Sequence, residues 1–240
     1  MIIVIPCYKE SLRLPHFLPG LVEALAGAGC KIQVVDDGSP AEDREKIDQH
    51  VEELRLKFGE ILLPLLSLSV NQGKGKAIRA GWSLHQREAQ LAFVDADGAI
   101  APHEVGRFVR IAQANPEKAY FASRVKMLGR TVTRKVMRHL YGRVFATFVS
   151  VRLNAPVYDT QCGLKTIPGE IFRTHQERFQ ENGFAFDAEL LLILLKLGVS
   201  VEEVPIDWTH IEGSKVRLIR DSFAMFTSLN AIVKRHSVWT

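Results

Sequence analysis

The sequence predicts an α/β domain with a mostly parallel central sheet and helices on both faces. Short apolar runs alternate with longer helical stretches through the first half of the chain. Such alternation is typical of a parallel sheet whose strands are joined by helical crossovers. The chain has 240 residues, of which 47% are hydrophobic, so it is long enough to bury the core of one large domain.

The predicted elements of the first half follow one another in regular order. Pro15, Pro40 and Pro102 lie near helix starts, where a missing N–H costs little. In sheets of this kind, ligands bind beyond the carboxyl ends of the strands, and polar residues cluster at those positions here. The expected strands are 2–6, 32–36, 63–68, 91–95 and 119–123, and the expected helices lie near 15–27, 41–57, 74–87 and 102–114.

The second half has a different pattern. A basic helix is expected over 134–153, followed by a polar turn at 159–163, a helix over 187–197 and a strand over 201–206. A last helix is expected over 217–235. The first and the last helix of this half each carry an apolar stripe. The stripe residues are Met137, Tyr141, Val144, Phe148 and Val151 in the first helix and Ile219, Phe223, Phe226, Leu229 and Val233 in the last.

Cysteine usage and hydropathy bear on the cellular setting. Cys7, Cys30 and Cys162 form no Cys-x-x-Cys pair, which argues against a disulfide framework or structural zinc and fits a reducing cytosol. The most apolar run, 190–195, is far shorter than the ~20 residues of a bilayer span. The chain also starts directly with an apolar strand rather than a signal peptide. We therefore expect a cytoplasmic protein that is not secreted.

Positive charge is concentrated in one part of the sequence. The net charge is only +4, but no acidic residue lies between Glu117 and Asp159. Such a block indicates anionic partners, for example phosphates or acidic lipid. The basic residues in this stretch are Lys118, Arg124, Lys126, Arg130, Arg134, Lys135, Arg138, Arg143 and Arg152.

The sequence Asp95-Ala96-Asp97 is the most informative motif. It follows the apolar run 91–94, so both carboxylates are expected at the carboxyl end of a buried strand. Two converging carboxylates repel each other unless a cation lies between them, and Mg²⁺ suits such a site together with substrate phosphates. The alternative is that the motif caps a turn or helix.

Two further strand-end motifs extend this interpretation. Asp36-Asp37-Gly38-Ser39 offers carboxylates to a base or ribose, and the alternative is a turn and a helix cap, although two carboxylates exceed what a cap needs. Gly73-Lys74-Gly75-Lys76 begins a helix and can place N–H and ammonium groups near phosphates. It is not a Walker A loop, and no G-x-G-x-x-G dinucleotide fingerprint follows any strand. Together the motifs predict a nucleotide-diphosphate site with a divalent cation.

At this point the ordered motifs resemble those of family 2 glycosyltransferases of the GT-A fold, and most of all the dolichyl-phosphate and polyprenyl-phosphate sugar synthases. The similarity is collinear from about residue 2 to 216. The matching segments are 3–10 (IVIPCYKE), 34–39 (VVDDGS), 71–76 (NQGKGK), 94–99 (VDADGA), 122–124 (ASR), 159–165 (DTQCGLK), 186–191 (FDAELL), 203–208 (EVPIDW) and 213–215 (GSK).

The resemblance implies a domain organisation and a set of donor residues. A GT-A catalytic domain would span 1–216, with a nucleotide-sugar half (1–125) and an acceptor half (126–216), followed by an amphipathic helix at 217–240. Asp95 and Asp97 would hold Mg²⁺ or Mn²⁺. The remaining donor nucleotide-binding residues would be Pro6, Tyr8, Glu10, Asp36, Asp37, Gly73, Lys74, Lys76 and Ala96.

The resemblance also implies a catalytic and acceptor side. Arg124, Arg134 and Lys215 would contact phosphates, while Asp159 and Gln161 would lie where the sugar meets the acceptor. The acceptor-binding residues would be Arg134, Arg138, Asp187 and Glu189, although Asp187 and Glu189 could instead cap a helix. The family inverts the anomeric configuration.

The chemistry depends on the acceptor. A lipid monophosphate is already ionised near neutral pH and needs no general base, whereas a sugar hydroxyl needs a carboxylate base, for which Asp159 or Asp187 would be the candidates. Cations would stabilise the departing nucleoside diphosphate. The expected reaction is transfer of a hexose, from UDP-glucose, to a polyprenyl phosphate at a membrane surface. The amphipathic helices could contact the inner face of that membrane peripherally, or pack on the domain.

Several alternatives stay open. GDP-mannose could be the donor, or a saccharide the acceptor. Lys9 departs from the family's usual Asn, and Thr133-Arg134 replaces the usual Ser-Arg, while Gly98-Ala99 favours the glucosyl branch. A sugar nucleotidyltransferase would show a Gly-rich first loop, which is missing. A non-enzymatic basic module binding RNA or membrane is a further reading, but no RNA-recognition signature is visible, so we expect no nucleic-acid partner.

Overall fold

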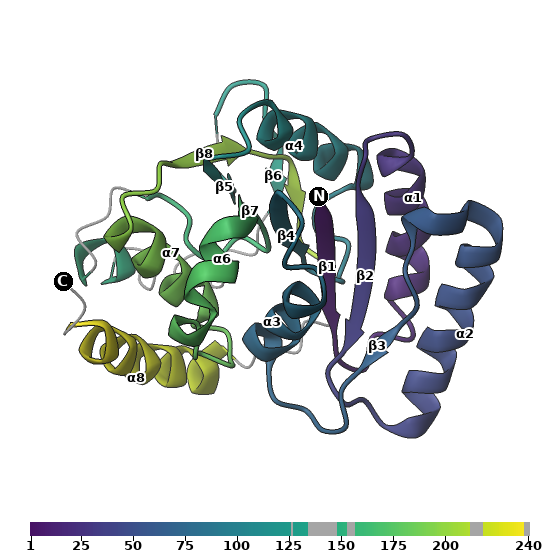
Figure 1. The fold of residues 1–240 in the computed structure, drawn as a ribbon, viewed down its shortest axis with the longest axis horizontal. Helices are drawn as coiled ribbons and strands as arrows, with labels where there is room; N and C mark the ends of the chain where they lie inside the picture. Colours follow the sequence, from purple (N-terminus) through teal and green to yellow (C-terminus); the bar gives the residue numbers. More distant parts are fainter. Residues whose placement is uncertain (126, 134–147, 153–156, 212–217, 238–240) are drawn as a thin grey trace.

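The computed structural model describes residues 1–125, 127–133, 148–152, 157–211 and 218–237. Its core is a seven-stranded sheet in the order β3-β2-β1-β4-β7-β5-β8 (Figure 1). All neighbouring pairs are parallel except those made by β7, which runs antiparallel to both β4 and β5. The predicted mostly parallel α/β fold is confirmed. The strands are β1 (Ile2–Cys7), β2 (Lys31–Asp36), β3 (Leu66–Ser67), β4 (Gln90–Val94), β5 (Ala119–Ser123), β7 (Leu164–Pro168) and β8 (Val201–Pro205).

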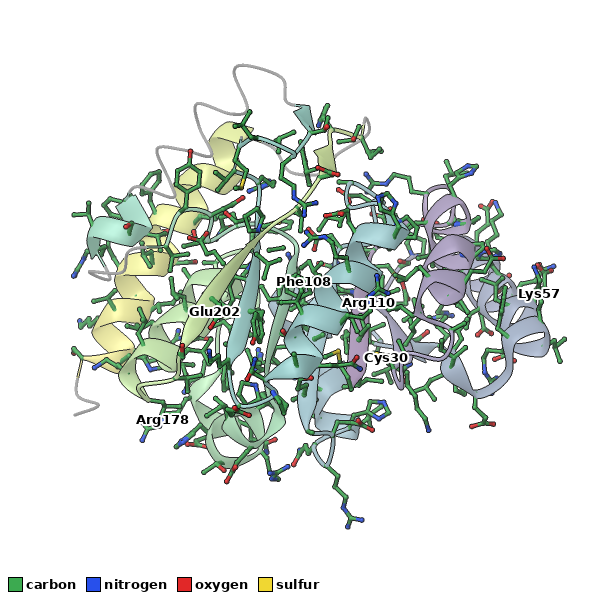
Figure 2. The ribbon with its side chains drawn as sticks, turned by 90° about the horizontal axis from the view of Figure 1, so that it is seen from above. Cys30, Lys57, Phe108, Arg110, Arg178 and Glu202 are labelled. Carbon is green, nitrogen blue, oxygen red and sulfur yellow. The ribbon has the colours of Figure 1, made fainter. Side chains whose placement is uncertain are left out.

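Helices cover both faces of this sheet, because successive strand residues point to opposite sides. Ile3 and Ile5 of β1 pack with one cluster, which includes apolar residues of α1, α2 and α4, among them Phe108 of α4 (Figure 2). Ile2 and Val4 pack with the other, which includes residues of α3, α6, α7 and α8. The helices are α1 (Leu14–Leu25), α2 (Ala41–Phe58), α3 (Lys74–Leu84), α4 (Pro102–Ala114), α6 (Gly169–His175), α7 (Phe186–Lys196) and α8 (Leu218–His236).

Most predicted elements of the first half match the structure closely, and α4 and β5 have the predicted bounds. The strand predicted over 63–68 is only Leu66–Ser67, since Pro64 cannot donate a ladder hydrogen bond. Neither β7 nor α6 was predicted. The helix expected over 134–153 lies mostly outside the described residues, of which 148–152 are helical.

The last helix, α8, packs on the domain along its described side chains. Leu229 and Ile232 are fully buried, and Leu229 belongs to the cluster on the α7 face of the sheet. The outward positions, among them Asn230 and Lys234, are exposed and polar. Packing on the domain, one of the two alternatives for this helix, therefore describes its C-terminal half.

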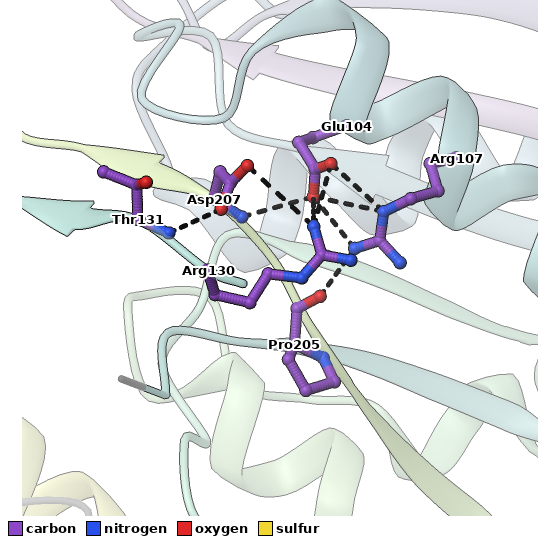
Figure 3. A network of polar contacts seen from close by, with 6 residues as sticks. All are labelled: Glu104, Arg107, Arg130, Thr131, Pro205 and Asp207. Carbon is purple, nitrogen blue, oxygen red and sulfur yellow. Dashed lines mark hydrogen bonds and ion pairs between the residues drawn. The ribbon is translucent and has the colours of Figure 1, made fainter. Parts of the chain in front are cut away.

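A small second sheet joins β6 (Val132–Thr133) to β9 (Trp208–Thr209) in parallel. Glu104 of α4 holds this region in place, because its carboxylate accepts hydrogen bonds from Arg107 and Arg130 and from the backbone N–H of Asp207 (Figure 3). The Asp207 carboxylate in turn accepts the N–H of Thr131 at 2.7 Å. The network fixes the segment that follows Arg124 against α4.

Candidate functional site

Asp95 and Asp97 lie directly beyond the end of β4, at the carboxyl edge of the sheet, as predicted. The Asp95 N–H donates to the Gly163 carbonyl at 2.8 Å, which ties this loop to the start of β7. A Cβ on Gly163 would lie 2.0 Å from Oδ2 of Asp95. A side chain at position 163 would therefore displace the carboxylate of Asp95.

The electrostatics of this pair fit a divalent cation. Burial, and then the negative charge of Asp95, raise the pKa of Asp97. The Asp97 carboxylate accepts one hydrogen bond, from the Ala99 N–H at 3.0 Å. A cation bound between the two carboxylates would relieve their repulsion, and oxygen ligands are those that Mg²⁺ and Mn²⁺ prefer. The residues present therefore fit the metal that the motif predicted.

A chain of buried charges leads away from Asp95. Lys74, in the first turn of α3, contacts Asp95 at 2.8 Å and Asp187 of α7 at 3.4 Å. Burial alone would lower the pKa of Lys74, but Asp187 and Asp95 together raise it. Lys165 of β7 is fully buried and also donates to Asp187. Asp187 is thus held between two ammonium groups rather than exposed as a helix cap.

The second strand-end motif anchors the turn before α3. The carboxylate of Asp37 accepts the N–H groups of Gln72 and Gly73 at 2.9 and 2.7 Å. Asp36 is fully buried, and its Oδ2 accepts the Ser39 N–H at 3.1 Å. Its Oδ1 is also buried. The motif therefore builds a turn, in which Oδ1 of Asp36 is left without a hydrogen-bond partner among the described residues.

The first loop brings in a cation that the sequence analysis did not single out. Glu10 is buried and accepts a hydrogen bond from Nε of Arg13 at 2.7 Å. The hydrogen bond to Glu10 raises the pKa of Arg13, and the negative charges of Glu10, Asp97 and Asp95 add to this shift against the opposing effect of burial. Lys9, beside it, has a φ of 56°. Asn tolerates that left-handed conformation better than Lys, so the departure at position 9 costs backbone strain.

On the other side of the site, Arg124 and Asp159 form a bidentate ion pair. Nε and Nη2 of Arg124 donate to the carboxylate of Asp159 at 2.7 and 2.8 Å. Burial raises the pKa of Asp159, but Arg124 outweighs it and holds that pKa well below its usual range. The Arg124 guanidinium also lies 5.5 Å from the centre of the Trp208 ring. The two side chains thus hold each other in place and neutralise each other's charge.

The turn that carries Asp159 is fixed by a third carboxylate. Glu203 of β8 accepts the N–H groups of Tyr158 and Asp159 at 2.7 and 2.9 Å. Gln161 is partly exposed, and its backbone N–H donates to Oδ1 of Asp159 at 3.3 Å. These contacts present Gln161 at the same edge as Asp95, to which the neighbouring Gly163 is bonded.

The predicted residues thus fall into three groups. The structure brings together the donor residues and Arg124, Asp159, Gln161 and Asp187 at the carboxyl edge. Glu189 is fully buried and bonds to the 180–181 backbone and to α8, so its predicted contact with an acceptor has no support here. Arg134, Arg138 and Lys215 lie outside the described residues. Lys165 was missed because a lysine inside a strand carries no obvious motif.

A second cluster of potential metal ligands lies apart from this edge. His103, Glu104 and Asp207 bring one ligand atom each within 4.8 Å of the others. Glu104, however, is already bound by Arg107 and Arg130, whose positive charges oppose a metal ion (Figure 3). Asp95 and Asp97 are therefore the better-suited pair for a divalent cation.

The family model described as "Glycosyl transferase family 2" matches residues 2–175. Among curated proteins, the dolichyl-phosphate beta-glucosyltransferase of Dictyostelium discoideum is 28% identical over 251 residues, covering 99% of this chain and 75% of that protein. The dolichyl-phosphate beta-glucosyltransferase of Drosophila melanogaster is 30% identical over 227 residues, covering 89% of this chain and 68% of that protein.

Solved structures give the same fold at lower sequence identity. A glucosyl-3-phosphoglycerate synthase from Mycobacterium tuberculosis, crystallised with Mn²⁺, UDP-glucose and phosphoglyceric acid, superposes with a TM-score of 0.68 at 14% identity, covering 100% of this chain and 80% of that one. A crystal of that enzyme with Mg²⁺ and UDP gives a TM-score of 0.67 at 13% identity over the same shares. Within the described residues, no helix is long and apolar enough to cross a membrane.

Proposed function

The chain belongs to glycosyl transferase family 2, and we propose that it transfers glucose from UDP-glucose to a dolichyl or other polyprenyl phosphate. The transfer inverts the anomeric carbon and depends on a divalent cation. The fold and the family make the protein a glycosyltransferase. The identity of donor and acceptor rests on the charges at the carboxyl edge of the sheet and on the names of the relatives.

The observation that carries the proposal is the state of the two candidate bases. Asp159 is bound by Arg124 in a bidentate pair, and its pKa lies well below its usual range. Asp187 lies between Lys74 and Lys165. A carboxylate already neutralised by a buried cation removes a proton from a hydroxyl poorly. An acceptor phosphate is ionised near neutral pH, so it can react without a base.

Two other carboxylates at this edge are also engaged in contacts. Glu10 is paired with Arg13, and Glu203 holds two backbone N–H groups. Burial raises the pKa of the nearby Cys162 thiol to about 12, so it does not supply a thiolate nucleophile. The described residues at this edge are therefore better suited to hold anions than to abstract protons.

The charged residues at this edge also explain how the donor would bind. Asp95 and Asp97 would hold Mg²⁺ or Mn²⁺, which supplies positive charge to the leaving diphosphate. Lys74, in the first turn of α3, would bind a diphosphate oxygen near the helix N-terminus. Arg124, fixed by Asp159, would orient the acceptor phosphate. An oxygen of the acceptor phosphate would form a bond to the anomeric carbon as the bond between that carbon and the diphosphate oxygen breaks. The electron pair of the broken bond would leave with UDP.

The comparisons support the choice of substrates. The curated relatives reported above are named for β-glucosyl transfer to dolichyl phosphate, which favours glucose over mannose. A solved structure of the same fold was crystallised with UDP-glucose, which favours UDP over GDP. The acid-free stretch from Lys118 to Tyr158 supplies cations for an anionic headgroup. We therefore place the reaction peripherally on the inner, cytoplasmic face of a membrane.

A direct assay tests the proposal. Purified protein with Mn²⁺ or Mg²⁺ would be given radiolabelled UDP-glucose or GDP-mannose, with dolichyl phosphate, phosphoglyceric acid or dolichol as acceptor. We expect label in a lipid product only with UDP-glucose, dolichyl phosphate and metal. Dolichol is the matched control, since it lacks only the phosphate. Transfer to dolichol but not to its phosphate, or a preference for GDP-mannose, would contradict the proposal.

A further inference from the structure

Glu189 is a fully buried carboxylate that the proposed reaction does not use. It lies in α7, and its side chain has 0% exposure. Its Oε2 accepts the backbone N–H groups of Gln180 and Glu181 at 2.8 and 2.7 Å. Its Oε1 accepts a hydrogen bond from Nη1 of Arg235 at 2.8 Å and lies 3.3 Å from Nε2 of His236. One carboxylate therefore joins the loop before α7 to the C-terminal end of α8.

That loop rests directly on the first turn of α3. The Lys76 N–H donates to the carbonyl of Asn182 at 3.2 Å. A Cβ on Gly73 would lie 2.4 Å from the Asn182 oxygen, and a Cβ on Gly75 would lie 2.4 Å from the Glu181 oxygen. The two glycines allow the loop backbone to approach this closely, so a shift of the loop must move the turn.

Arg79, one turn further along α3, strengthens this contact. Its Nη1 donates to the Phe179 carbonyl at 2.6 Å, and its Nη2 donates to the side chain of Asn182. The first turn of α3 also carries Lys74, which lies 2.8 Å from Asp95. Continuous contacts thus run from Arg235 and His236, through Glu189 and the loop, to the donor side of the site.

We propose that Glu189 is a positioning residue for the donor site, and that α8 acts as a clamp whose docking on Glu189 sets the affinity for the donor nucleotide. Arg235 and His236 lie beyond residue 175, where the match to the family model ends. The clamp is built by the C-terminal segment onto the domain that carries the site. The inference rests on the proposed donor, a nucleoside diphosphate.

Coupling of this kind is reciprocal. If docking of α8 favours nucleotide binding, nucleotide binding must favour docking of α8 by the same factor. We therefore expect UDP with Mn²⁺ to slow amide hydrogen exchange in the last turns of α8. A change confined to α3 and the strand ends would contradict the coupling.

The decisive comparison uses two neighbouring residues of α8. Arg235→Met removes the cation from Glu189, whereas Lys234→Met removes the same charge from an exposed neighbour. Isothermal titration with UDP and Mn²⁺ should give a dissociation constant about three- to tenfold higher for Arg235→Met, with Lys234→Met close to wild type. Arg235→Lys keeps the charge and should restore part of the affinity.

Measurements on two variants distinguish the clamp from a merely structural role. If Arg235→Met lowers the unfolding midpoint but the folded protein binds UDP as tightly as Lys234→Met does, the clamp is wrong. Glu189→Gln, which keeps the volume of the side chain, provides a second variant and should weaken UDP binding in the same way. It should also raise KM for the donor more than it lowers kcat.

The test also works if the donor assignment fails. If wild type binds no UDP, that failure concerns the proposed function, and the clamp is then measured without a ligand. Exchange of the Lys76 amide, which donates to Asn182, should be faster in Arg235→Met than in Lys234→Met. Equal exchange rates in the two variants would overturn the clamp.

Discussion

The carboxylates of Asp97 and Asp159 lie at the same edge of the sheet, yet their surroundings shift their pKa values in opposite directions. Asp97, buried beside the like charge of Asp95, has a raised pKa. Asp159, bound in two places by Arg124, has a lowered pKa. Among the described residues Asp97 has no ion-pair partner, and Asp95 shares Lys74 with Asp187, whereas Arg124 neutralises Asp159. The Asp95–Asp97 pair therefore suits a divalent cation, whereas the Arg124–Asp159 pair is already neutral.

The largest expected effect comes from breaking the neutral pair. Asp159→Asn leaves the Arg124 guanidinium buried without its carboxylate, which should cost about 3–5 kcal/mol of unfolding free energy. Urea denaturation followed by circular dichroism measures this, and transferase activity should be lost as Arg124 moves. Glu202→Gln is the control, because it breaks an exposed pair with Lys118. Equal, small losses for both variants would contradict the comparison.

Acid should break the same pair gradually. The folded-state pKa of Asp159 is depressed, so the stability that the pair contributes is fully present above the unfolded pKa of about 3.9. It is lost as pH falls from there toward the lower folded pKa, by up to about 1.4 kcal/mol per pH unit. The gap in unfolding free energy between wild type and Asp159→Asn should therefore narrow below about pH 4. A constant gap down to pH 2 would count against this account.

The donor pair should respond to metal instead. UDP with Mn²⁺ at about a hundred times its dissociation constant should stabilise wild type by about 2.7 kcal/mol. Asp97→Asn keeps the acceptor oxygen that binds the Ala99 N–H but removes the charge, so most of this stabilisation should disappear. In the absence of metal the variant should be no less stable than wild type, because the repulsion with Asp95 is relieved. Thermal unfolding with and without ligands measures both expectations.

The smallest change probes the geometry of Asp95. Gly163→Ala would place a Cβ 2.0 Å from Oδ2 of Asp95, and the displaced carboxylate should weaken Mn²⁺-dependent UDP binding about tenfold, or about 1.4 kcal/mol. Gly20→Ala in α1 is the control, since its Cβ would meet only the side chain of Pro102, at 3.1 Å. Calorimetry with each variant measures the effect, and unchanged binding in Gly163→Ala would remove Asp95 from the metal site.

The sequence predicted the elements and motifs of the first half of the chain better than those of the second half. The β1–α4 region repeats a local pattern, in which each apolar strand ends in polar residues and each helix begins near a proline or glycine. Both α4 and β5 were predicted with their bounds, and the strand-end motifs led to Asp37, Lys74, Asp95 and Asp97. The roles predicted from the motifs were incomplete. Asp37 was predicted to line the nucleoside pocket, and its carboxylate also accepts hydrogen bonds from two backbone N–H groups.

The second half could not be predicted as well, because its main features depend on long-range partners. The strand β7 contains Lys165, a residue that breaks an apolar run and is rarely buried. Inside the sheet its charge is neutralised by Asp187, which is distant in sequence, and its ammonium also donates to the Cys162 carbonyl at 2.6 Å. Its antiparallel position between β4 and β5 follows from pairing with strands far along the chain.

By itself, the sequence determined the fold class, the order of the first elements, the family resemblance and the position of Asp95 and Asp97 at a strand end, since all of these follow from local periodicity and contiguous motifs. Only the tertiary structure decided which charges meet. It paired Asp159 with Arg124, placed Asp187 between two lysines and turned Glu189 toward α8. The reason is physical: the state of a carboxylate depends on the dielectric and the charges within a few ångströms, and those neighbours come from strands and helices that are remote in sequence.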